Sequence, residues 1–127
     1  MQIIATDNAP QAIGPYSQAV MVEGILYSSG QIALTPEGEL IDGGVAEQIR
    51  QVLNNLSAVL EEAGGTLNDV IKTTIFLADM SDFTVVNEVY AEFFGDHRPA
   101  RSTVAVKTLP KEVLVEIDCI AKPGISL

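Results

Sequence analysis

The stretch from Val45 to Ala63 constrains the fold more than any other part of the sequence. Its apolar residues recur every three or four positions, which places them on one face of a helix. They are Val45, Ile49, Val52, Leu53, Leu56, Val59, Leu60 and Ala63. Gly64 and Gly65 follow, and glycine tolerates the left-handed backbone that ends many helices. The sequence therefore predicts a helix over residues 45–63 with one face packed against a sheet.

Short apolar segments on either side of this helix predict strands of that sheet. Before the helix, Ala19 to Glu23 and Ile25 to Gln31 are typical of two strands joined in a hairpin at Glu23-Gly24. After the helix, Val70 to Ala78 is rich in β-branched residues and ends at an aspartate. We expect this segment to be a strand that is largely buried on both faces.

A second helix and two further strands complete the pattern. Ser81 is expected to cap this helix and Gly95 to end it. Its apolar stripe consists of Phe83, Val86, Tyr90, Phe93 and Phe94. The final strands are expected over Ser102 to Lys107 and Val113 to Ala121. The order, roughly β-β-β-α-β-α-β-β, predicts an α+β sandwich in which a mixed six-stranded sheet carries two helices on one face.

Two helices cover only one face of such a sheet, and the last strand indicates what the other face contains. Along this strand, one set of side chains alternates with another: Val113, Val115, Ile117 and Cys119 with Leu114, Glu116, Asp118 and Ile120. Successive side chains in a strand point to opposite faces, so the second face mixes apolar residues with two carboxylates. We expect a further copy of the chain to cover it, in a homo-oligomer. A solvated face with incidental leucine and isoleucine is the alternative.

Length, charge and cysteine content limit the class of protein. At 127 residues the chain has room for a single domain, spanning residues 1–127. Its formal net charge of -10, with 7 Lys and Arg against 17 Asp and Glu, makes nucleic acid an unfavourable partner. The single cysteine, Cys119, is expected to be buried and reduced. No signal peptide or membrane-spanning segment is recognisable, which predicts a cytoplasmic protein without a membrane partner.

The segment RPARST contains Arg98 and Arg101, two of the three arginines in the chain. Arg101 enters a predicted strand, and its planar fork of donors matches a carboxylate or a phosphate. An ion pair with Glu116 or Asp118 would occupy it equally well. Arg98 lies in the preceding turn, where a solvated charge near the end of a helix is the simpler interpretation.

Three further positions carry polar groups where the pattern expects apolar ones. Glu116 lies in the middle of an apolar strand, so it must be paired, protonated or used, and it is a candidate general base. Asp118 lies on the same face and is more simply interpreted as an interface acid. Asn87 interrupts the apolar stripe of the second helix, and either faces a polar pocket or caps a neighbouring backbone group.

Two short motifs are candidates for ligand contacts, and several common catalytic and metal-binding motifs are absent from the sequence. Tyr16 supplies an aromatic hydroxyl in GPYSQA, and SSGQ, at residues 28–31, ends a strand with small residues that a ligand can approach closely. A plain turn explains SSGQ equally well. One histidine and one cysteine exclude a metal site built from those ligands within a chain, and the nucleophile-elbow and phosphate-loop motifs are absent. No cofactor is implied.

Taken together, these features resemble the RidA family, also called the YjgF family. The resemblance extends nearly from end to end, and its motifs occur in the family's order and spacing: IGPYSQA, YSSGQI, EQIRQVLNNLSAVLEEAG, NEVYAEFF, RPARST and LVEIDCIA. It implies a chorismate-mutase-like fold of the bacillus type and a homotrimer with three clefts between subunits. It also implies hydrolytic deamination of reactive 2-imino acids and their enamine tautomers, such as 2-iminobutanoate and 2-iminopropanoate, to 2-oxo acids and ammonia.

The resemblance also implies roles for individual residues. Arg101 matches the arginine that binds the substrate carboxylate, and Glu116 matches the acid that orients the attacking water. Positions that line the cleft and bind substrate are matched by Tyr16, Ser29, Gly30 and Asn87. Thr103 stands where many family members have cysteine, and a threonine should serve there if the position contributes mainly backbone groups to the ligand.

Other functions of the same fold stay open on the sequence alone. A family member could bind a small carboxylate without catalysis, as a sensor or regulator of amino-acid or purine metabolism. The endoribonuclease label carried by parts of the family is disfavoured here by the net charge of -10. A chaperone-like holdase would require an exposed apolar patch.

Overall fold

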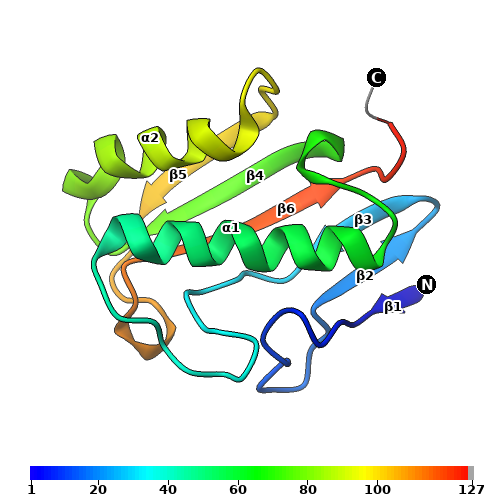
Figure 1. The fold of residues 1–127 in the computed structure, drawn as a ribbon, viewed down its shortest axis with the longest axis horizontal. Coiled ribbons are helices and arrows are strands. Elements are labelled where there is room, and N and C mark those ends of the chain that lie inside the picture. Colours follow the sequence, from blue (N-terminus) through cyan, green and yellow to red (C-terminus); the bar gives the residue numbers. More distant parts are fainter. Residues whose placement is uncertain (126–127) are drawn as a thin grey trace.

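The computed structural model describes residues 1–125, which form one mixed sheet with helices packed on it (Figure 1). The strands are β1 (Gln2–Ile4), β2 (Ala19–Val22), β3 (Ile25–Ser28), β4 (Val70–Leu77), β5 (Ala100–Ala105) and β6 (Val115–Ala121). The helices are α1 (Val45–Glu62) and α2 (Phe83–Phe94), with short 3-10 helices η1 (Leu67–Asp69), η2 (Met80–Asp82) and η3 (Pro110–Glu112). The strand order in the sheet is β1-β2-β3-β6-β4-β5, with β4 and β5 parallel and the other neighbours antiparallel. The predicted α+β order and mixed six-stranded sheet are confirmed.

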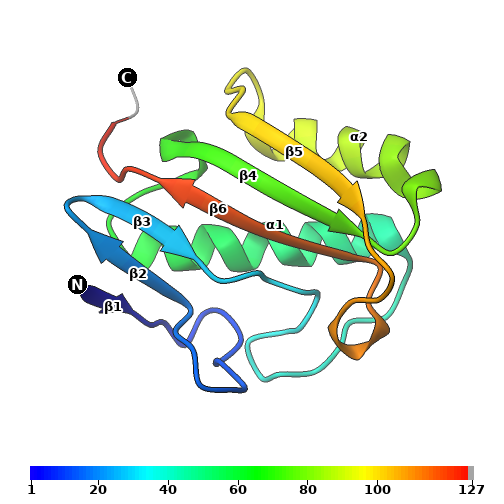
Figure 2. The same cartoon turned by 180° about the vertical axis from the view of Figure 1, so that it is seen from behind.

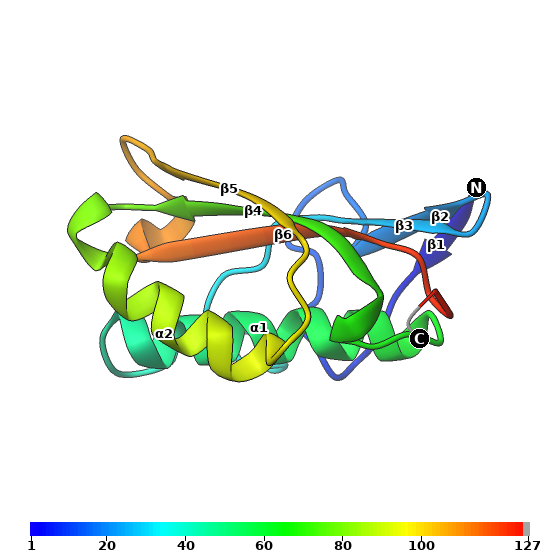
Figure 3. The same ribbon diagram turned by 90° about the horizontal axis from the view of Figure 1, so that it is seen from above.

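Both α-helices lie on the same face of the sheet, as Figure 3 shows from the side. The main core fills the space between the helices and the sheet. Side chains in this layer with no more than 1% exposure include Ile49, Leu53, Leu56, Leu60, Ile75 and Ile117. Fully burying one such aliphatic side chain stabilises a fold by about 1.5–3 kcal/mol, so this layer determines how α1 lies on the sheet.

Helix α1 ends within one residue of the predicted position. Ala63 is its C-terminal cap, and Gly64 follows with a φ of 83°, a left-handed conformation that glycine adopts without steric cost. The sheet-facing side of α1 also carries a buried amide: Asn55 donates to the carbonyl oxygens of Ile32, at 3.1 Å, and Leu34, at 2.9 Å. These hydrogen bonds hold the segment that follows β3 against the helix.

The hairpin between β2 and β3 turns at Glu23 and Gly24, as predicted. Their φ values are 51° and 79°, which fits a two-residue turn that requires positive φ at both central positions. Strand β3 ends at Ser28, earlier than predicted, and Gln31 makes only an isolated bridge to Ile117 of β6. The intervening residues leave the sheet ladder and form a loop next to β6.

Helix α2 begins later than predicted, and Ser81 does not cap it. The α-helix is preceded by η2, whose cap is Asp79: its carboxylate accepts a hydrogen bond from the backbone N–H of Ser81 at 2.8 Å. Aspartate and serine side chains reach a backbone N–H two residues on in the same way, so the spacing alone does not separate them. The predicted end of the helix at Gly95 is confirmed, with a φ of 59°.

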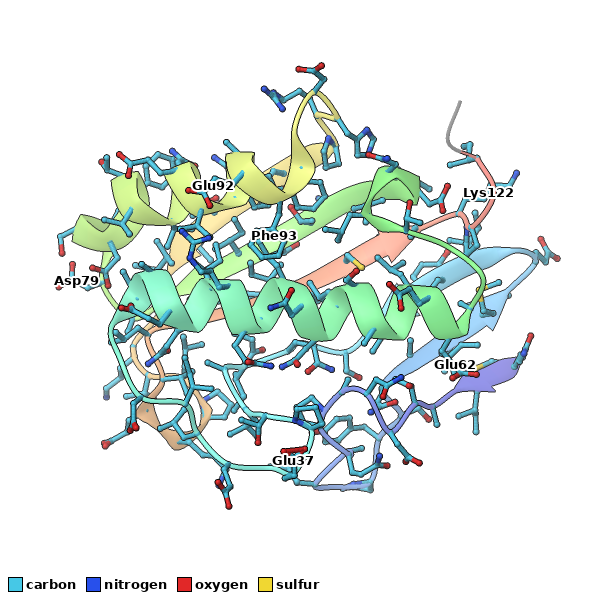
Figure 4. The ribbon with its side chains drawn as sticks, in the orientation of Figure 1. Glu37, Glu62, Asp79, Glu92, Phe93 and Lys122 are labelled. Atoms are coloured by element: carbon cyan, nitrogen blue, oxygen red, sulfur yellow. The ribbon has the colours of Figure 1, made fainter. Side chains whose placement is uncertain are left out.

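Helices α1 and α2 contact each other on the sheet (Figure 4). Phe93 of α2 points into the space between them, and the carboxylate of Glu92 pairs with Arg50 of α1 at 2.7 Å. This is the one ion pair within residues 1–125, and its solvent exposure keeps its contribution to stability small. Neither helix in that range combines the length and apolar character that a membrane span needs.

Within a single chain, strand β4 is fully buried on one face and partly buried on the other, so its predicted burial on both faces stays a prediction that depends on a partner. Ile75 and Leu77 are fully buried beneath the helices, whereas Thr74 and Phe76 are half-buried on the opposite face. A run of β-branched residues reports strand propensity and does not reveal how many faces are covered. Strand β5 also starts and ends earlier than predicted, because it pairs with β4 from Ala100 onward.

No helix covers the other face of the sheet, the open face (Figure 2), although Phe76 on this face packs against a small cluster of Ile32, Leu34, Leu109 and Val113. The predicted alternation in β6 is confirmed: Glu116, Asp118 and Ile120 are half-buried on this face, and Cys119 is buried on the other. The open face also carries apolar side chains, among them Tyr27 and Val104, which are 45% and 42% exposed. A further copy of the chain that covers this face stays a prediction.

Candidate active site

Arg101 lies on β5, an edge strand of the sheet, and its side chain turns toward α2. Its guanidinium carbon lies 5.0 Å from the ring centre of Tyr90 and 5.6 Å from that of Phe83. Tyr90 is itself held in place, because its hydroxyl forms a 2.8 Å hydrogen bond with the hydroxyl of Thr73 on β4. Aromatic faces attract a cation electrostatically, so the two rings orient the guanidinium without occupying its hydrogen-bond donors.

Arg101 borders a hollow of about 300 Å³ at the edge of the sheet, which we call the arginine hollow. Its lining consists of Asn87, Tyr90, Ala91, Arg98, Pro99 and Arg101. Asn87 therefore faces a polar pocket, which is the first of the two roles that its place in the helix predicted. No carboxylate within residues 1–125 pairs with Arg101, so its donors remain available to a ligand.

Arg98 lies in the turn between α2 and β5, exposed as the sequence predicted, and it also hydrogen-bonds to this turn. Its Nη1 donates to the carbonyl oxygen of Gly95 and, at 3.2 Å, to that of His97. The Nε2 atom of His97 lies 2.7 Å from the carbonyl oxygen of Val70, which ties the same turn to the start of β4. Arg98 also borders the arginine hollow, and the sequence did not predict this.

Glu116 lies on the open face and borders a second hollow, which we call the glutamate hollow. The residues that line this hollow include Tyr16, Gly30, Gln31, Pro110 and Glu116. Gly30 fits there because it has no side chain: a Cβ atom at this position would lie 2.8 Å from the carboxyl carbon of Glu116. Tyr16 is half exposed, and its hydroxyl accepts a hydrogen bond from the backbone N–H of Ile13 at 3.4 Å.

The environment of Glu116 favours its protonated form more than water does. Burial raises the pKa of the Glu116 carboxyl, and the negative charge of Asp118 raises it further. Burial also raises the pKa of Asp118, although a hydrogen bond from Thr74 and the charge of Lys72 oppose this shift. A carboxyl whose pKa lies above its ordinary value exchanges a proton more readily near neutral pH, as a general acid or base must.

Arg101 and Glu116 lie on opposite faces of the sheet. The register shows this: Arg101 pairs with Thr73 of β4, on the helix side, whereas Glu116 pairs with Phe76, on the open side. Residues directly opposite one another in a sheet share a face. An ion pair between Arg101 and Glu116 or Asp118, which the sequence left open, is therefore wrong within a chain. Each chain therefore presents the two side chains at separate places on its surface.

Thr103 and Ser29 are close in the chain to Arg101 and Gly30, but neither residue lines the arginine hollow or the glutamate hollow. Thr103 shares a face with Arg101 two residues along β5, and its Oγ1 is buried with no hydrogen-bond partner within the part of the chain described. A buried hydroxyl without a partner costs about 1–3 kcal/mol, which a ligand or a water could recover. The Ser29 hydroxyl is already used, because it donates to the carbonyl oxygen of Ser17 at 2.6 Å. No group of three His, Cys, Asp or Glu side chains in residues 1–125 could hold a metal ion.

The aromatic support of Arg101 was missed from the sequence, although a signal for it was present. Phe83, Asn87 and Tyr90 follow one another at four and then three residues, which places them on one side of α2. The predicted apolar stripe contains both rings and assigns them to the core alone. The structure adds that the same rings contact the guanidinium of a neighbouring strand.

Comparisons with known proteins agree with one another. The sequence profile of the family described as Endoribonuclease L-PSP matches residues 6–122. A RutC family protein of Pyrococcus horikoshii is 54% identical over 121 residues, 94% of this chain and 96% of that one. Human 2-iminobutanoate/2-iminopropanoate deaminase is 47% identical over 124 residues, 97% of this chain and 90% of that one. The crystal structure of E. coli TdcF with bound serine superimposes with a TM-score of 0.91 at 44% identity, covering 96% of this chain and 98% of that one.

Proposed function

Because the chain belongs to the Endoribonuclease L-PSP family, which is also the RidA or YjgF family, we propose that it hydrolyses 2-imino acids to 2-oxo acids and ammonia. The proposed substrates are 2-iminobutanoate and 2-iminopropanoate, and the names of mammalian relatives support this choice. The observation that carries the proposal is Arg101, an unpaired guanidinium oriented by two aromatic rings at a hollow. Such a group suits the carboxylate that every 2-imino acid contains.

The proposed site is complete only when two chains meet. Arg101 is on the helix side of the edge strand β5, and Glu116 is on the open face of β6. A neighbouring copy that docks its open face at this edge would bring its Glu116 to the arginine hollow. It would also cover the unpaired edge and the exposed apolar side chains. The proposed assembly is the homotrimer with three clefts between subunits that the family resemblance implies, in which such contacts would form.

The mechanism then follows from the two halves. Arg101 binds the substrate carboxylate in a bidentate manner, and Glu116 of the adjoining copy accepts a proton from a water held near C2. The water oxygen forms a bond to C2 as the electron pair of the C=N bond moves to nitrogen. Glu116 returns the proton to that nitrogen, which gives a carbinolamine with one hydroxyl and one amino group on C2. Glu116 then transfers the hydroxyl proton to the amino nitrogen; the C–N bond breaks with its electron pair leaving on ammonia, and the oxygen forms the C=O bond of the 2-oxo acid. Asn87, Tyr16, Ser29, Gly30 and Thr103 shape the cleft around these atoms.

So sparse a site is sufficient because the substrate is already reactive. An imine carbon next to a carboxylate hydrolyses in water without a catalyst, so the protein needs only a modest reduction of the barrier. Each tenfold gain in rate requires about 1.4 kcal/mol. Orientation of the substrate carboxylate, together with one positioned water, can supply several tenfold gains in rate.

The direct test is the rate of 2-oxobutanoate formation from freshly generated 2-iminobutanoate, with and without the protein. We expect acceleration that is proportional to protein concentration and absent after heat denaturation. No acceleration, together with binding of 2-oxobutanoate, would support instead a sensor of small carboxylates, because the arginine hollow suits a carboxylate ligand in either case. Cleavage of RNA is not expected, because the net charge of -10 repels phosphates.

Replacing Gly30 by alanine is expected to reduce deaminase activity about tenfold or more, since the new Cβ would displace the carboxyl of Glu116. The measurement is kcat/KM for 2-iminobutanoate. Gly44→Ala is a matched control, because a Cβ at Gly44 meets no atom closer than 3.9 Å and the site lies elsewhere. A Gly30→Ala protein with native kcat/KM would remove Glu116 from the proposed mechanism.

A further inference from the structure

Two guanidinium groups border the arginine hollow, although one is enough to bind a monocarboxylate. Arg98 and Arg101 both belong to its lining, and both are exposed. They are two of the three arginines in a chain of net charge -10, and the third, Arg50, is paired with Glu92. No Asp or Glu in residues 1–125 pairs with either of the two. Positive charge is therefore concentrated at this hollow of an acidic protein.

Arg98 retains donors for a ligand. Its Nη1 is engaged by the carbonyl oxygens of Gly95 and His97, whereas its Nε and Nη2 atoms make no hydrogen bond within the residues that the structure describes. A guanidinium presents its N–H groups in a planar fork, so contacts at one nitrogen hold its orientation and leave the other donors available. Binding to the turn and binding to an anion are thus compatible roles for the same side chain.

The pair of charges favours a particular kind of ligand. Like charges that border one small hollow repel each other, and a ligand with two anionic groups relieves this repulsion more than a ligand with one. The hollow, at about 300 Å³, lies at the lower end of the range for small-molecule sites and has room for a short-chain acid. A second carboxylate at the far end of the substrate fits both observations.

We propose, on the basis of the proposed deaminase function, that Arg98 selects dicarboxylic 2-imino acids by binding their distal carboxylate while Arg101 binds the carboxylate next to the imine carbon. The substrates of this class are the imines that correspond to aspartate and glutamate. The reaction at C2 is unchanged: water adds, ammonia leaves, and the distal carboxylate keeps its charge throughout. Arg98 determines specificity and takes no part in the proton transfers.

The 2-oxo acid products are stable analogues with which to test this selection. We expect the intact protein to bind 2-oxoglutarate about five- to tenfold more tightly than 2-oxobutanoate in calorimetric titrations at low salt. The ratio of the two Kd values should fall to about one in Arg98→Met, and it should decrease in the native protein as salt rises. Arg50→Met is the matched control, since it removes the same charge from α1 and should preserve the native ratio.

The other outcomes overturn the inference. Three results would show that Arg98 does not bind a second carboxylate. They are a Kd ratio near one in the native protein, an unchanged Kd ratio in Arg98→Met, and no binding of either oxo acid. If Arg98→Met raised the Kd values of 2-oxoglutarate and 2-oxobutanoate by the same factor, Arg98 would have only the structural role of holding the turn. Turnover of the corresponding imines separates the two proposals: equal kcat/KM for 2-iminoglutarate and 2-iminobutanoate overturns the selection alone. Selective binding without any turnover overturns the deaminase function alone.

Discussion

Arg101→Ala is expected to reduce kcat/KM for 2-iminobutanoate about a hundredfold or more while the chain stays folded. Two charge-assisted hydrogen bonds to the substrate carboxylate are lost, each of about 1.5–3 kcal/mol, and the reacting carbon loses its fixed position. Arg101 is exposed on an edge strand and has no carboxylate partner within residues 1–125, so its removal should disturb the core little. The measurement is steady-state deamination, with thermal unfolding followed in parallel.

Two companion variants make this result specific. Arg50→Ala removes the same charge from α1, where Arg50 is already paired with Glu92, and should leave kcat/KM near the native value. Arg101→Lys keeps the charge but not the planar fork, and it should recover only part of the activity. A folded Arg101→Ala protein with native kcat/KM would show that Arg101 does not bind the substrate carboxylate during catalysis.

The elements that the sequence predicted best are those with local, redundant signals. Helix α1 has eight apolar positions in helical register followed by two glycines, and its predicted end was wrong by one residue. The hairpin at Glu23 and Gly24 was also correct, because a two-residue turn admits few sequences. The cap at Asp79 was missed since Ser81, two residues on, has the same chemistry.

The geometry of the site depends on information that one strand does not contain. Alternation along β5 places Arg101 with Thr103, and alternation along β6 places Glu116 with Asp118. The alternation in β6 already assigned Glu116 to the face away from the helices, but the face of Arg101 follows only from the pairing of β5 with β4, and that register was not predictable. The sequence therefore allowed an ion pair between Arg101 and Glu116, which the sheet makes impossible within a chain. The sequence was sufficient to choose candidate site residues, but not to predict that Arg101 and Glu116 lie on opposite faces of the sheet.

This division predicts that two inactive variants restore activity to each other. Arg101→Ala has an intact Glu116, and Glu116→Gln has an intact Arg101; alone, each should be nearly inactive. When equal amounts are unfolded together and refolded, random mixing in the proposed homotrimer should give about a quarter of the sites Arg101 from one copy and Glu116 from the next. The measurement is deaminase activity after refolding, relative to native protein treated in the same way.

The recovered fraction distinguishes a shared site from a site within one chain. If Arg101 and Glu116 acted from the same chain, mixing the two variants would restore nothing, because no chain would carry both groups. A second mixture gives an independent check: native chain refolded with the Arg101→Ala/Glu116→Gln double variant should retain about a quarter of the activity for a shared site and about half for a site within one chain. Because the sheet separates the two side chains, recovery in the first mixture and a quarter in the second are the results that the structure predicts.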